Sequence, residues 1–366
     1  MDVKTCFITS FYDLATIENN SVRRNSTQYY EFAEEILKRP IDLFFIGEDV
    51  DVTRVWKLRK DAGLLERTFC LSMPFTSLPT YEYIPALKKI IDEKGVYGIK
   101  GDARLSANYV ALTWSKLAFL QKAANLNPFE SSHFCWIDFG YFHMREQFDY
   151  LMPGRITNDI FLNINNSWVH HGTLDNRFRI CLLNDFTDDD IIDSKKYYSN
   201  DNFQMAATIM GGGKEVIEII WEKFKKQIAL TMRLGIATPE ENIIGRIAYF
   251  FPELFDYTLG YYSTSLQNFA QITKFPENTY ELGIKWRREE KKQFAFDVLS
   301  KIADGIMSGQ GDIVSKNIVY EVFYELIICA FYVNYQAYCY YRDYYKEWLK
   351  VNNYEIKGLL EMNLSF

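Results

Sequence analysis

The sequence predicts an α/β protein: a mixed, mainly parallel sheet flanked by helices, followed by a helical C-terminal appendage. Apolar, strand-like runs alternate with helical patterns from the first residues onward, and this order favours parallel strands joined by crossover helices. From Ile284 the pattern changes to a dense mixed-charge run and then to aromatic-rich helical periodicity. A length of 366 residues suits two units. We therefore expect a sheet domain over residues 1–283 and a helical appendage over residues 284–366.

The elements follow one another along the chain in a βαβαβ order. The first five expected elements are a strand at Thr5–Tyr12, a helix at Ser26–Lys38, a strand at Ile41–Ile46, a helix at Val52–Ala62 and a strand at Arg67–Ser72. A long amphipathic helix at Ser106–Asn125 precedes further strands at Ile156–Leu162, Phe178–Asn184 and Phe203–Met210, and a helix follows at Lys214–Leu234. These patterns predict one continued sheet.

Composition excludes several classes of protein. Hydrophobic residues make up 48% and aromatic residues 17%, enough for a large core. The net charge is −7, and no basic stripe interleaves with aromatic residues, so a nucleic-acid partner is not expected. The six cysteines are scattered without a CxxC pair and indicate reduced core residues.

The ends of the chain and its apolar runs indicate a cytoplasmic protein. Met1–Lys4 leads straight into the first strand, which leaves no room for a signal peptide. The late apolar run Leu326–Tyr341 is shorter than the roughly 20 residues of a spanning helix. The charged run Lys285–Lys292 is interpreted as a solvated helix face, with contact to an anionic membrane surface as the alternative.

The most informative segment is the run His133–Ile137 and the polar residues after it. The run is aromatic and β-prone, and it ends in Asp138, with Gly140 and His143 close behind. A buried strand that stops here places Asp138 at its carboxyl end, where open α/β sheets bind ligands. The alternative is that Asp138 only caps a following helix.

Two later segments combine a turn with a helix start. Gly211-Gly212-Gly213 precedes a helix whose amino terminus offers N–H groups to an anion, although a plain tight turn explains the glycines as well. Thr238-Pro239-Glu240-Glu241 has an N-cap, a proline and acidic residues in the order of a helix start. Capping accounts for one of these glutamates.

Several short motifs together resemble a known family. The motifs are Phe7–Asp13, Leu58-Arg59-Lys60, Ser115-Lys116, Asn127-Pro128-Phe129, Trp136–Gly140 with His143, Gly211–Gly213, and Pro252–Phe255 through Gly260-Tyr261-Tyr262 and Asn268. With them the chain, over roughly residues 3 to 270, resembles the HtrL/YibB family. That family is similar to nucleotide-sugar glycosyltransferases of the GT-A fold, which is related to the Rossmann fold. The resemblance implies transfer of a sugar to a glycan or glycolipid acceptor in surface glycan assembly.

The resemblance also implies a set of site residues. The expected donor-binding residues are Thr9, Phe11, Arg59, Lys116, Asp138, Gly140, Gly211 and Gly212. Glu241 is the expected catalytic base, with Glu240 as the second candidate, because an inverting transfer needs a carboxylate to deprotonate the acceptor.

The cofactor expected from the resemblance is a divalent metal, Mn²⁺ or Mg²⁺, which neutralises the leaving diphosphate. The Asp-X-Asp motif of such enzymes reads Asp138-Phe139-Gly140 here, so the second carboxylate is missing. Either Asp138 holds the metal with His143 or a distant residue, or Lys116 and backbone N–H groups neutralise the charge.

Other acidic and histidine motifs are weaker candidates. Asp49-Val50-Asp51 has the Asp-X-Asp spacing but is expected to begin a helix, and Asp188-Asp189-Asp190 is expected to lie in a solvated loop. Adjacent histidines in a strand point to opposite faces, so at most one of His170 and His171 would enter a site.

Three functions remain open from the sequence. The first is a glycosyltransferase. The second is a non-catalytic protein that binds a glycan or nucleotide sugar, and the missing carboxylate favours it. The third is a metal-dependent hydrolase that uses Asp138 and His143. The aromatic surface of the appendage is expected to be covered, either in a homodimer or against the sheet domain.

Overall fold

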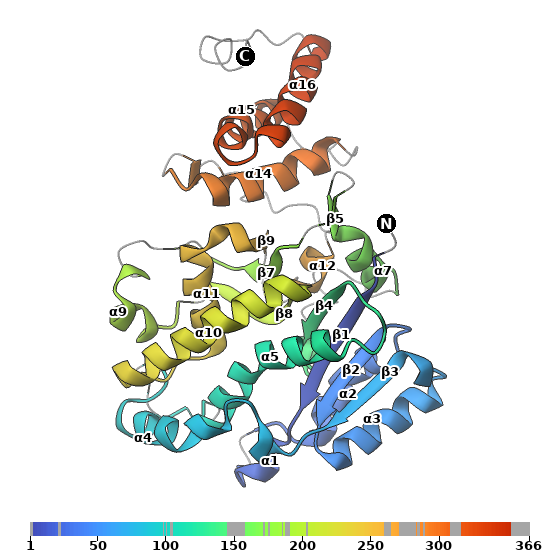
Figure 1. Ribbon diagram of the computed structural model, residues 1–366, viewed down its shortest axis with the longest axis vertical. Helices are drawn as coiled ribbons and strands as arrows, with labels where there is room; N and C mark the ends of the chain where they lie inside the picture. The colour runs from blue at the N-terminus through green and yellow to red at the C-terminus, as the bar shows by residue number, and fades with distance from the viewer. Residues whose placement is uncertain are drawn as a thin grey trace. The chain divides into compact units, whose positions relative to one another are not determined.

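The computed structural model describes residues 3–352 apart from 21–22, 98, 100, 103–104, 145–157, 171–172, 175, 185, 187–190, 203, 260–264, 271–282, 284–285, 288–289 and 308–315. The chain divides into two compact units, Met1–Ile272 and Thr273–Phe366. The first unit contains the sheet and the second is helical (Figure 1).

A seven-stranded sheet forms the centre of the first unit, with the strand order β3-β2-β1-β4-β8-β7-β9 (Figure 1). The strands are β1 (Thr5–Phe11), β2 (Asp42–Gly47), β3 (Thr68–Ser72), β4 (His133–Ile137), β7 (Phe178–Leu182), β8 (Met205–Gly213) and β9 (Phe255–Leu259). Among these strands β8 runs antiparallel to its neighbours, and the other pairs are parallel. The predicted mixed, mainly parallel sheet is confirmed.

The direction of the crossovers changes at β1. The chain passes from β1 to β2 and β3 on one side, whereas β4 pairs with β1 on the other side. In open α/β sheets, ligands bind beyond the carboxyl ends of the strands at such a switch point. We call the edge with the carboxyl ends of β1 to β4 the carboxyl edge, and the opposite one the amino edge.

Helices α4 (Ile84–Lys94), α5 (Ala107–Leu126), α10 (Lys214–Leu234) and α11 (Glu240–Phe250) lie together on one side of the sheet (Figure 1). The Ser106 side chain caps α5 by accepting the Tyr109 N–H, and Asn127 ends it in a left-handed conformation. Most of α5 is buried because it packs on β1 and β4 and against α4 and α10. It is therefore a rigid support for side chains that reach the carboxyl edge.

The other face is covered by α2 (Ser26–Leu37), α3 (Asp49–Asp61), α7 (Asn158–Ser167) and α12 (Ser265–Phe269). Their buried side chains form one core with Phe7, Cys135 and Ile209 of the sheet. The strand predicted at Ile156–Leu162 is wrong in its described part, which belongs to α7. Four apolar residues among polar ones fit one face of a helix as well as a short strand, and periodicity does not separate the two.

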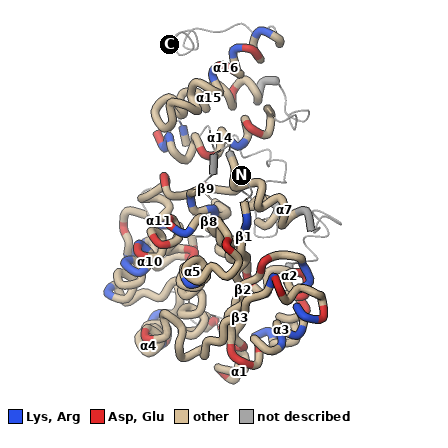
Figure 2. Tube along the Cα trace, turned by 45° about the vertical axis from the view of Figure 1, so that its right-hand side comes forward, with Lys and Arg blue, Asp and Glu red and all other residues tan. Residues whose placement is uncertain are grey.

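Several short elements are also described in the first unit. They are α1 (Leu14–Ile17), η1 (Leu65–Arg67), η2 (Phe75–Ser77), η3 (Tyr81–Tyr83), η4 (Tyr141–Met144), α9 (Ser194–Tyr198), η5 (Pro252–Leu254) and a two-stranded sheet of β5 (Val169–His170) and β6 (Thr173–Leu174). Lys and Arg residues alternate with Asp and Glu over the helices, with no single-sign stripe along the described chain (Figure 2).

The helices described in the second unit are α14 (Lys292–Met307), α15 (Lys316–Val333) and α16 (Tyr335–Asn352). Phe323 stacks on Tyr345 at 5.5 Å between ring centroids, and the Tyr341 hydroxyl donates to Asp304 Oδ1 at 2.8 Å. These contacts join the three helices through aromatic side chains. In the described part of the chain, no helix is long and apolar enough to cross a membrane.

The turn between α15 and α16 exposes aromatic side chains. Tyr332 and Tyr335 are 64% and 62% exposed. If these rings contribute to a homodimer, Tyr332→Ser combined with Tyr335→Ser is expected to shift the mass in solution from dimer to monomer, measured by light scattering. Val351→Ser, at an 80% exposed position of α16, is the matched control. A native chain that is already monomeric would contradict the predicted dimer.

Candidate functional site at the carboxyl edge

Asp138 follows the last residue of β4 and lies at the carboxyl edge. Side chains alternate along a strand, so Asp138 lies on the same face as Trp136, the face covered by α5. Its Oδ1 accepts the Trp136 indole N–H at 2.6 Å, and its backbone N–H donates to Thr208 O at 2.9 Å. The carboxylate is thus held at the strand end by a neighbour on its own strand and by β8. Its side chain is 30% exposed.

Lys116 of α5 brings a cation to this carboxylate. Its Nζ lies 2.9 Å from Asp138 Oδ1 and 2.8 Å from Glu240 Oε1, and it donates to Ala207 O at 3.2 Å. The ammonium also lies 5.7 Å from the centroid of the Trp136 ring. Burial alone would lower the pKa of Lys116, but the Asp138 and Glu240 carboxylates outweigh burial and raise the pKa above its ordinary value. Burial raises the pKa of Asp138, and Lys116 opposes this shift.

Glu240 and Glu241 open α11 beside Lys116. Acidic residues in a first turn are stabilised by the helix dipole. Glu240 is nearly buried and pairs with Lys116, whereas Glu241 Oε1 accepts the Ala207 N–H at 3.0 Å. The backbone of Ala207 therefore contacts both side chains: its carbonyl oxygen accepts from Lys116, and its N–H donates to Glu241.

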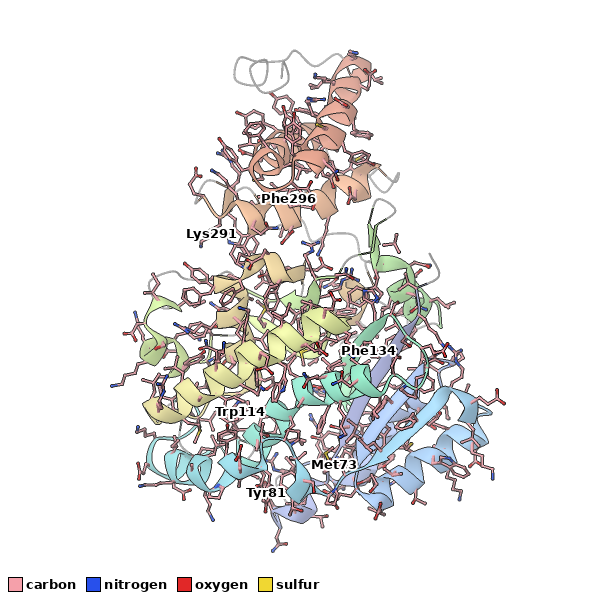
Figure 3. The ribbon with its side chains drawn as sticks, viewed as in Figure 1. Met73, Tyr81, Trp114, Phe134, Lys291 and Phe296 are labelled. Atoms are coloured by element: carbon pink, nitrogen blue, oxygen red, sulfur yellow. The ribbon has the colours of Figure 1, made fainter. Side chains whose placement is uncertain are left out.

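The segment before α11 is fixed by hydrogen bonds from two other elements. Trp114 of α5, labelled in Figure 3, donates its indole N–H to Thr238 O at 2.9 Å. The Tyr97 N–H donates to Ala237 O at 3.1 Å, and Lys94 Nζ donates to Gly235 O at 2.9 Å. These three bonds set the position from which Glu240 and Glu241 project.

Two tyrosines that the sequence patterns did not indicate, Tyr97 and Tyr109, border the site. Burial raises the pKa of Tyr97 above its ordinary value, and the Glu241 and Asp201 carboxylates raise it further. Burial also raises the pKa of Tyr109. The Glu240 carboxylate raises this pKa further, and the Lys116 ammonium lowers it. Tyr97 has a φ of +53°, an uncommon conformation for a tyrosine. No local pattern in the sequence marks either residue, because both come to the site only through the fold.

The residues predicted at the end of β1 are core residues. Thr9 is fully buried, and Phe11 is 5% exposed and stacks on Phe139 with 5.0 Å between ring centroids. Their side chains therefore support the carboxyl edge from within, and contact of these residues with a donor stays a prediction. Gly140 lies in the turn after Asp138, where a Cβ would meet the Tyr29 ring at 2.8 Å.

Arg59 was predicted to bind the donor, and the structure contradicts this. Its guanidinium is fully buried at the amino edge, where α2 ends and β2 and β3 begin. The hydrogen bonds of this guanidinium go to Leu37 O at 3.1 Å, Arg39 O at 2.6 Å, Ile41 O at 2.7 Å, Arg67 O at 3.0 Å and Thr68 Oγ1 at 2.8 Å. All five N–H donors are used, so Arg59 is a structural residue that ties the sheet to its helices.

Gly211 and Gly212 are likewise not at the proposed site. They lie inside β8, where Gly211 pairs with Cys135 in the middle of β4 and Gly212 with Phe134 toward its amino end, because β8 runs antiparallel to β4. A Cβ on Gly211 would lie 2.1 Å from Phe134 O. The glycines therefore permit close approach of two strands, and they do not form a phosphate-binding loop.

Gly211→Ala is accordingly expected to lower the free energy of unfolding by about 1–3 kcal/mol or more, through overpacking. Gly213→Ala is the matched control, because the nearest atom to a Cβ there is Asn176 Oδ1 at an ordinary 3.6 Å. Urea denaturation of both variants measures the difference. Equal midpoints for the two variants would contradict the close-packing role.

Lys116 stands where a divalent metal bound to Asp138 would meet a second carboxylate, because its ammonium lies between Asp138 and Glu240. His143 Nδ1 lies 2.7 Å from Gly140 O within its own turn, a contact that orients the ring and leaves Nε2 as its ligand atom. In the part of the chain that the structure describes, no group of three or more His, Cys, Asp or Glu side chains is arranged to hold a metal ion. Metal dependence therefore stays a prediction for binding experiments.

The weaker motifs do not join the site. Asp49 and Asp51 lie in the first turn of α3, as predicted, and Asp51 Oδ1 accepts the Tyr30 hydroxyl at 2.9 Å. Asp188-Asp189-Asp190 and His171 lie outside the described residues.

Comparison with known proteins identifies the family. No curated protein matches the chain. One solved structure that it resembles is the apo form of mouse xyloside xylosyltransferase 1, with 12% sequence identity over 70% of this chain and 84% of that chain, and a TM-score of 0.33. A TM-score of that size supports no inference about the reaction. The family model described as "Bacterial protein of unknown function (HtrL_YibB)" matches residues 3–271. Because this match spans well over half of the sequence, the chain belongs to the HtrL/YibB family.

Proposed function

We propose that the chain is a glycosyltransferase that moves a sugar from a nucleotide-diphosphate donor to a glycan or glycolipid acceptor in surface glycan assembly. One observation carries the proposal: at the carboxyl edge beside the switch point, the Lys116 ammonium lies between Asp138 and Glu240, and Glu241 accepts the N–H of Ala207, whose carbonyl accepts from Lys116. The site thus offers a lysine ammonium, already paired with Asp138 and Glu240, to a leaving phosphate, and a further carboxylate for proton removal.

The cation supports departure of the nucleotide diphosphate. As the bond between the anomeric carbon and the phosphate oxygen breaks, that oxygen gains negative charge, and a nearby positive charge stabilises it. Two unit charges about 4 Å apart attract each other by roughly 4 kcal/mol at an effective dielectric constant near 20. The Lys116 side chain is 12% exposed, so water screens it only in part.

The base is proposed to be Glu241. Glu240 is committed to Lys116 in a nearly buried pair, and loss of its negative charge would leave the ammonium less compensated. Glu241 is more exposed and is oriented by the Ala207 N–H through Oε1. In an inverting transfer, the acceptor hydroxyl attacks the anomeric carbon and its proton passes to the Glu241 carboxylate, while the diphosphate leaves with the bonding electron pair.

A calorimetric screen of nucleotide diphosphates and nucleotide sugars, each with Mn²⁺ and with EDTA, tests the proposal. Any hit then enters assays for donor hydrolysis and for transfer to glycan acceptors. We expect micromolar binding of at least one nucleotide diphosphate. Absence of binding under both conditions would contradict the proposal.

A non-catalytic glycan- or nucleotide-sugar-binding protein is the second candidate, favoured by Gly140 at the position of the second Asp-X-Asp carboxylate. It predicts binding without hydrolysis or transfer. The hydrolase alternative lacks a metal site in the described part of the chain, where no group of three or more His, Cys, Asp or Glu side chains is arranged to hold an ion.

A further inference from the structure

Three oxygens converge on the Lys116 ammonium, and they are of the types that bind hard divalent cations. They are Asp138 Oδ1 at 2.9 Å, Glu240 Oε1 at 2.8 Å and the carbonyl oxygen of Ala207 at 3.2 Å. Two carboxylates and a backbone carbonyl form a ligand set typical of Ca²⁺, Mg²⁺ or Mn²⁺. In this chain the position at their centre is held by a covalently attached ammonium.

We infer that Lys116 is a built-in replacement for a divalent cation at the carboxyl edge, so that diphosphate binding does not depend on metal and removal of the lysine side chain creates a divalent-cation site. The nucleotide part of this inference rests on the proposed function. The part that concerns the cation stands on the three contacts of Lys116 alone.

The surroundings favour a permanent ammonium over an exchangeable ion. The lysine stem comes from the well-packed helix α5, and its head lies near the face of the Trp136 ring. A metal that entered would have to displace this charged head from two carboxylates, and the freed ammonium would remain close to the metal and repel it. Both carboxylates raise the pKa of Lys116, which keeps the ammonium charged at neutral pH.

The oxygens are held closely enough to receive a metal once the lysine is shortened. Distances from a cation centre to its oxygens are roughly 2.0–2.6 Å for Mg²⁺, Mn²⁺ or Ca²⁺, so each ligand would have to move inward by about 0.2–1.2 Å. Glu240 lies in the first turn of α11, and Ala207 lies in β8 beside the end of β4. Small rotations of the two carboxylate side chains suffice for much of that movement.

The first experiment compares Mn²⁺ binding by the wild-type chain, Lys116→Ala and the matched control Lys122→Ala, whose lysine lies exposed on the same helix. Thermal unfolding with increasing Mn²⁺ and electron paramagnetic resonance of the bound ion are the readouts. We expect a saturable rise in Tm for Lys116→Ala and affinity at least about tenfold above that of the wild type and of Lys122→Ala. Adding Glu240→Gln to Lys116→Ala is expected to remove the gain.

Two results of this experiment would overturn the inference. The first is wild-type binding of Mn²⁺ as tight as that of Lys116→Ala, and the second is no gain of Mn²⁺ binding in a folded Lys116→Ala chain. If Lys116→Ala folds only when Mn²⁺ is present, that rescue supports the inference. If Lys116→Ala does not fold in either condition, the inference is tested by nucleotide binding to the wild-type chain with and without Mn²⁺.

That second measurement titrates the wild-type chain with a nucleoside diphosphate in EDTA and in Mn²⁺. Affinities within about threefold of each other are expected, whereas a gain of tenfold or more on adding Mn²⁺ would overturn the inference. A chain that binds no nucleotide under either condition contradicts the proposed function. In that case the appearance of a Mn²⁺ site in Lys116→Ala still decides the assignment of Lys116 itself.

Discussion

Arg59→Met is expected to lower the free energy of unfolding by at least about 3 kcal/mol and to leave the carboxyl-edge site unaffected in the molecules that remain folded. The substitution removes five hydrogen bonds, four of them to the carbonyl oxygens of Leu37, Arg39, Ile41 and Arg67. Arg39 O keeps the Ile41 N–H at 2.8 Å, and the contacts to Leu37 O and Ile41 O are the buried ones. Each buried acceptor without a partner costs about 1–3 kcal/mol, although such costs are not additive. Burial and the neighbouring Arg67 lower the pKa of Arg59 to about 10, so the guanidinium remains charged at pH 7.

Urea denaturation followed by circular dichroism measures this effect. Lys57→Met removes a positive charge from the exposed face of the same helix, α3, and serves as the control. Arg59→Lys is expected to be intermediate at best, because an ammonium does not reproduce the forked geometry of the guanidinium. An Arg59→Met chain that keeps its unfolding midpoint but loses nucleotide binding would support the prediction that Arg59 binds the donor.

Glu241→Gln is expected to reduce sugar transfer by roughly 100- to 10,000-fold while changing nucleotide affinity little. Glutamine keeps the shape of the side chain and can still accept the Ala207 N–H through its amide oxygen. What it loses is the ability to take a proton from the acceptor hydroxyl. The measurement is initial transfer rate at saturating donor, with donor affinity determined separately by calorimetry.

Glu240→Gln provides the matched comparison, because it neutralises the adjacent carboxylate. This change removes one partner of the Lys116 ammonium in a nearly buried pair, so it is expected to alter stability and donor affinity along with rate. If Glu241→Gln transfers sugar at the wild-type rate, Glu241 is not the base. A loss of rate confined to Glu240→Gln would assign that role to the neighbouring glutamate.

The sheet was predictable because its strands are short apolar runs separated by helices. The residues of β2 are all buried, as expected of a parallel strand covered on both faces, and the run Asp42–Gly47 is nearly continuous in apolar character. The strand predicted at Ile156–Leu162 failed for the opposite reason, since its few apolar residues suit a helix face equally well. Local pattern determines an element only when its period is clear.

The site was predictable only in part, because residue type does not reveal which edge of the sheet a residue reaches. Asp138 and Lys116 come together as their motifs suggested, and Glu240 joins them. Arg59 and Gly211 have equally suitable chemistry for a phosphate, but Arg59 lies at the amino edge and Gly211 lies within the sheet, opposite the middle of β4. The antiparallel direction of β8 determines where its glycines lie. That direction is set by pairing with strands distant in the sequence, so a local sequence pattern does not reveal it.

The antiparallel strand β8 also links the packing inside the sheet to the position of the charged side chains at the carboxyl edge. The Gly211 position allows the backbone to approach Phe134 O so closely that no residue with a Cβ fits there unless the strands shift. This contact fixes the register of β8 on β4, with Gly211 opposite Cys135 and Ile209 opposite Ile137. A slip by one residue would turn every side chain of β8 to the other face. It would also replace the Ala207 peptide groups that bind Lys116 and Glu241. A glycine opposite the middle of β4 therefore sets the alignment of charges at the carboxyl edge.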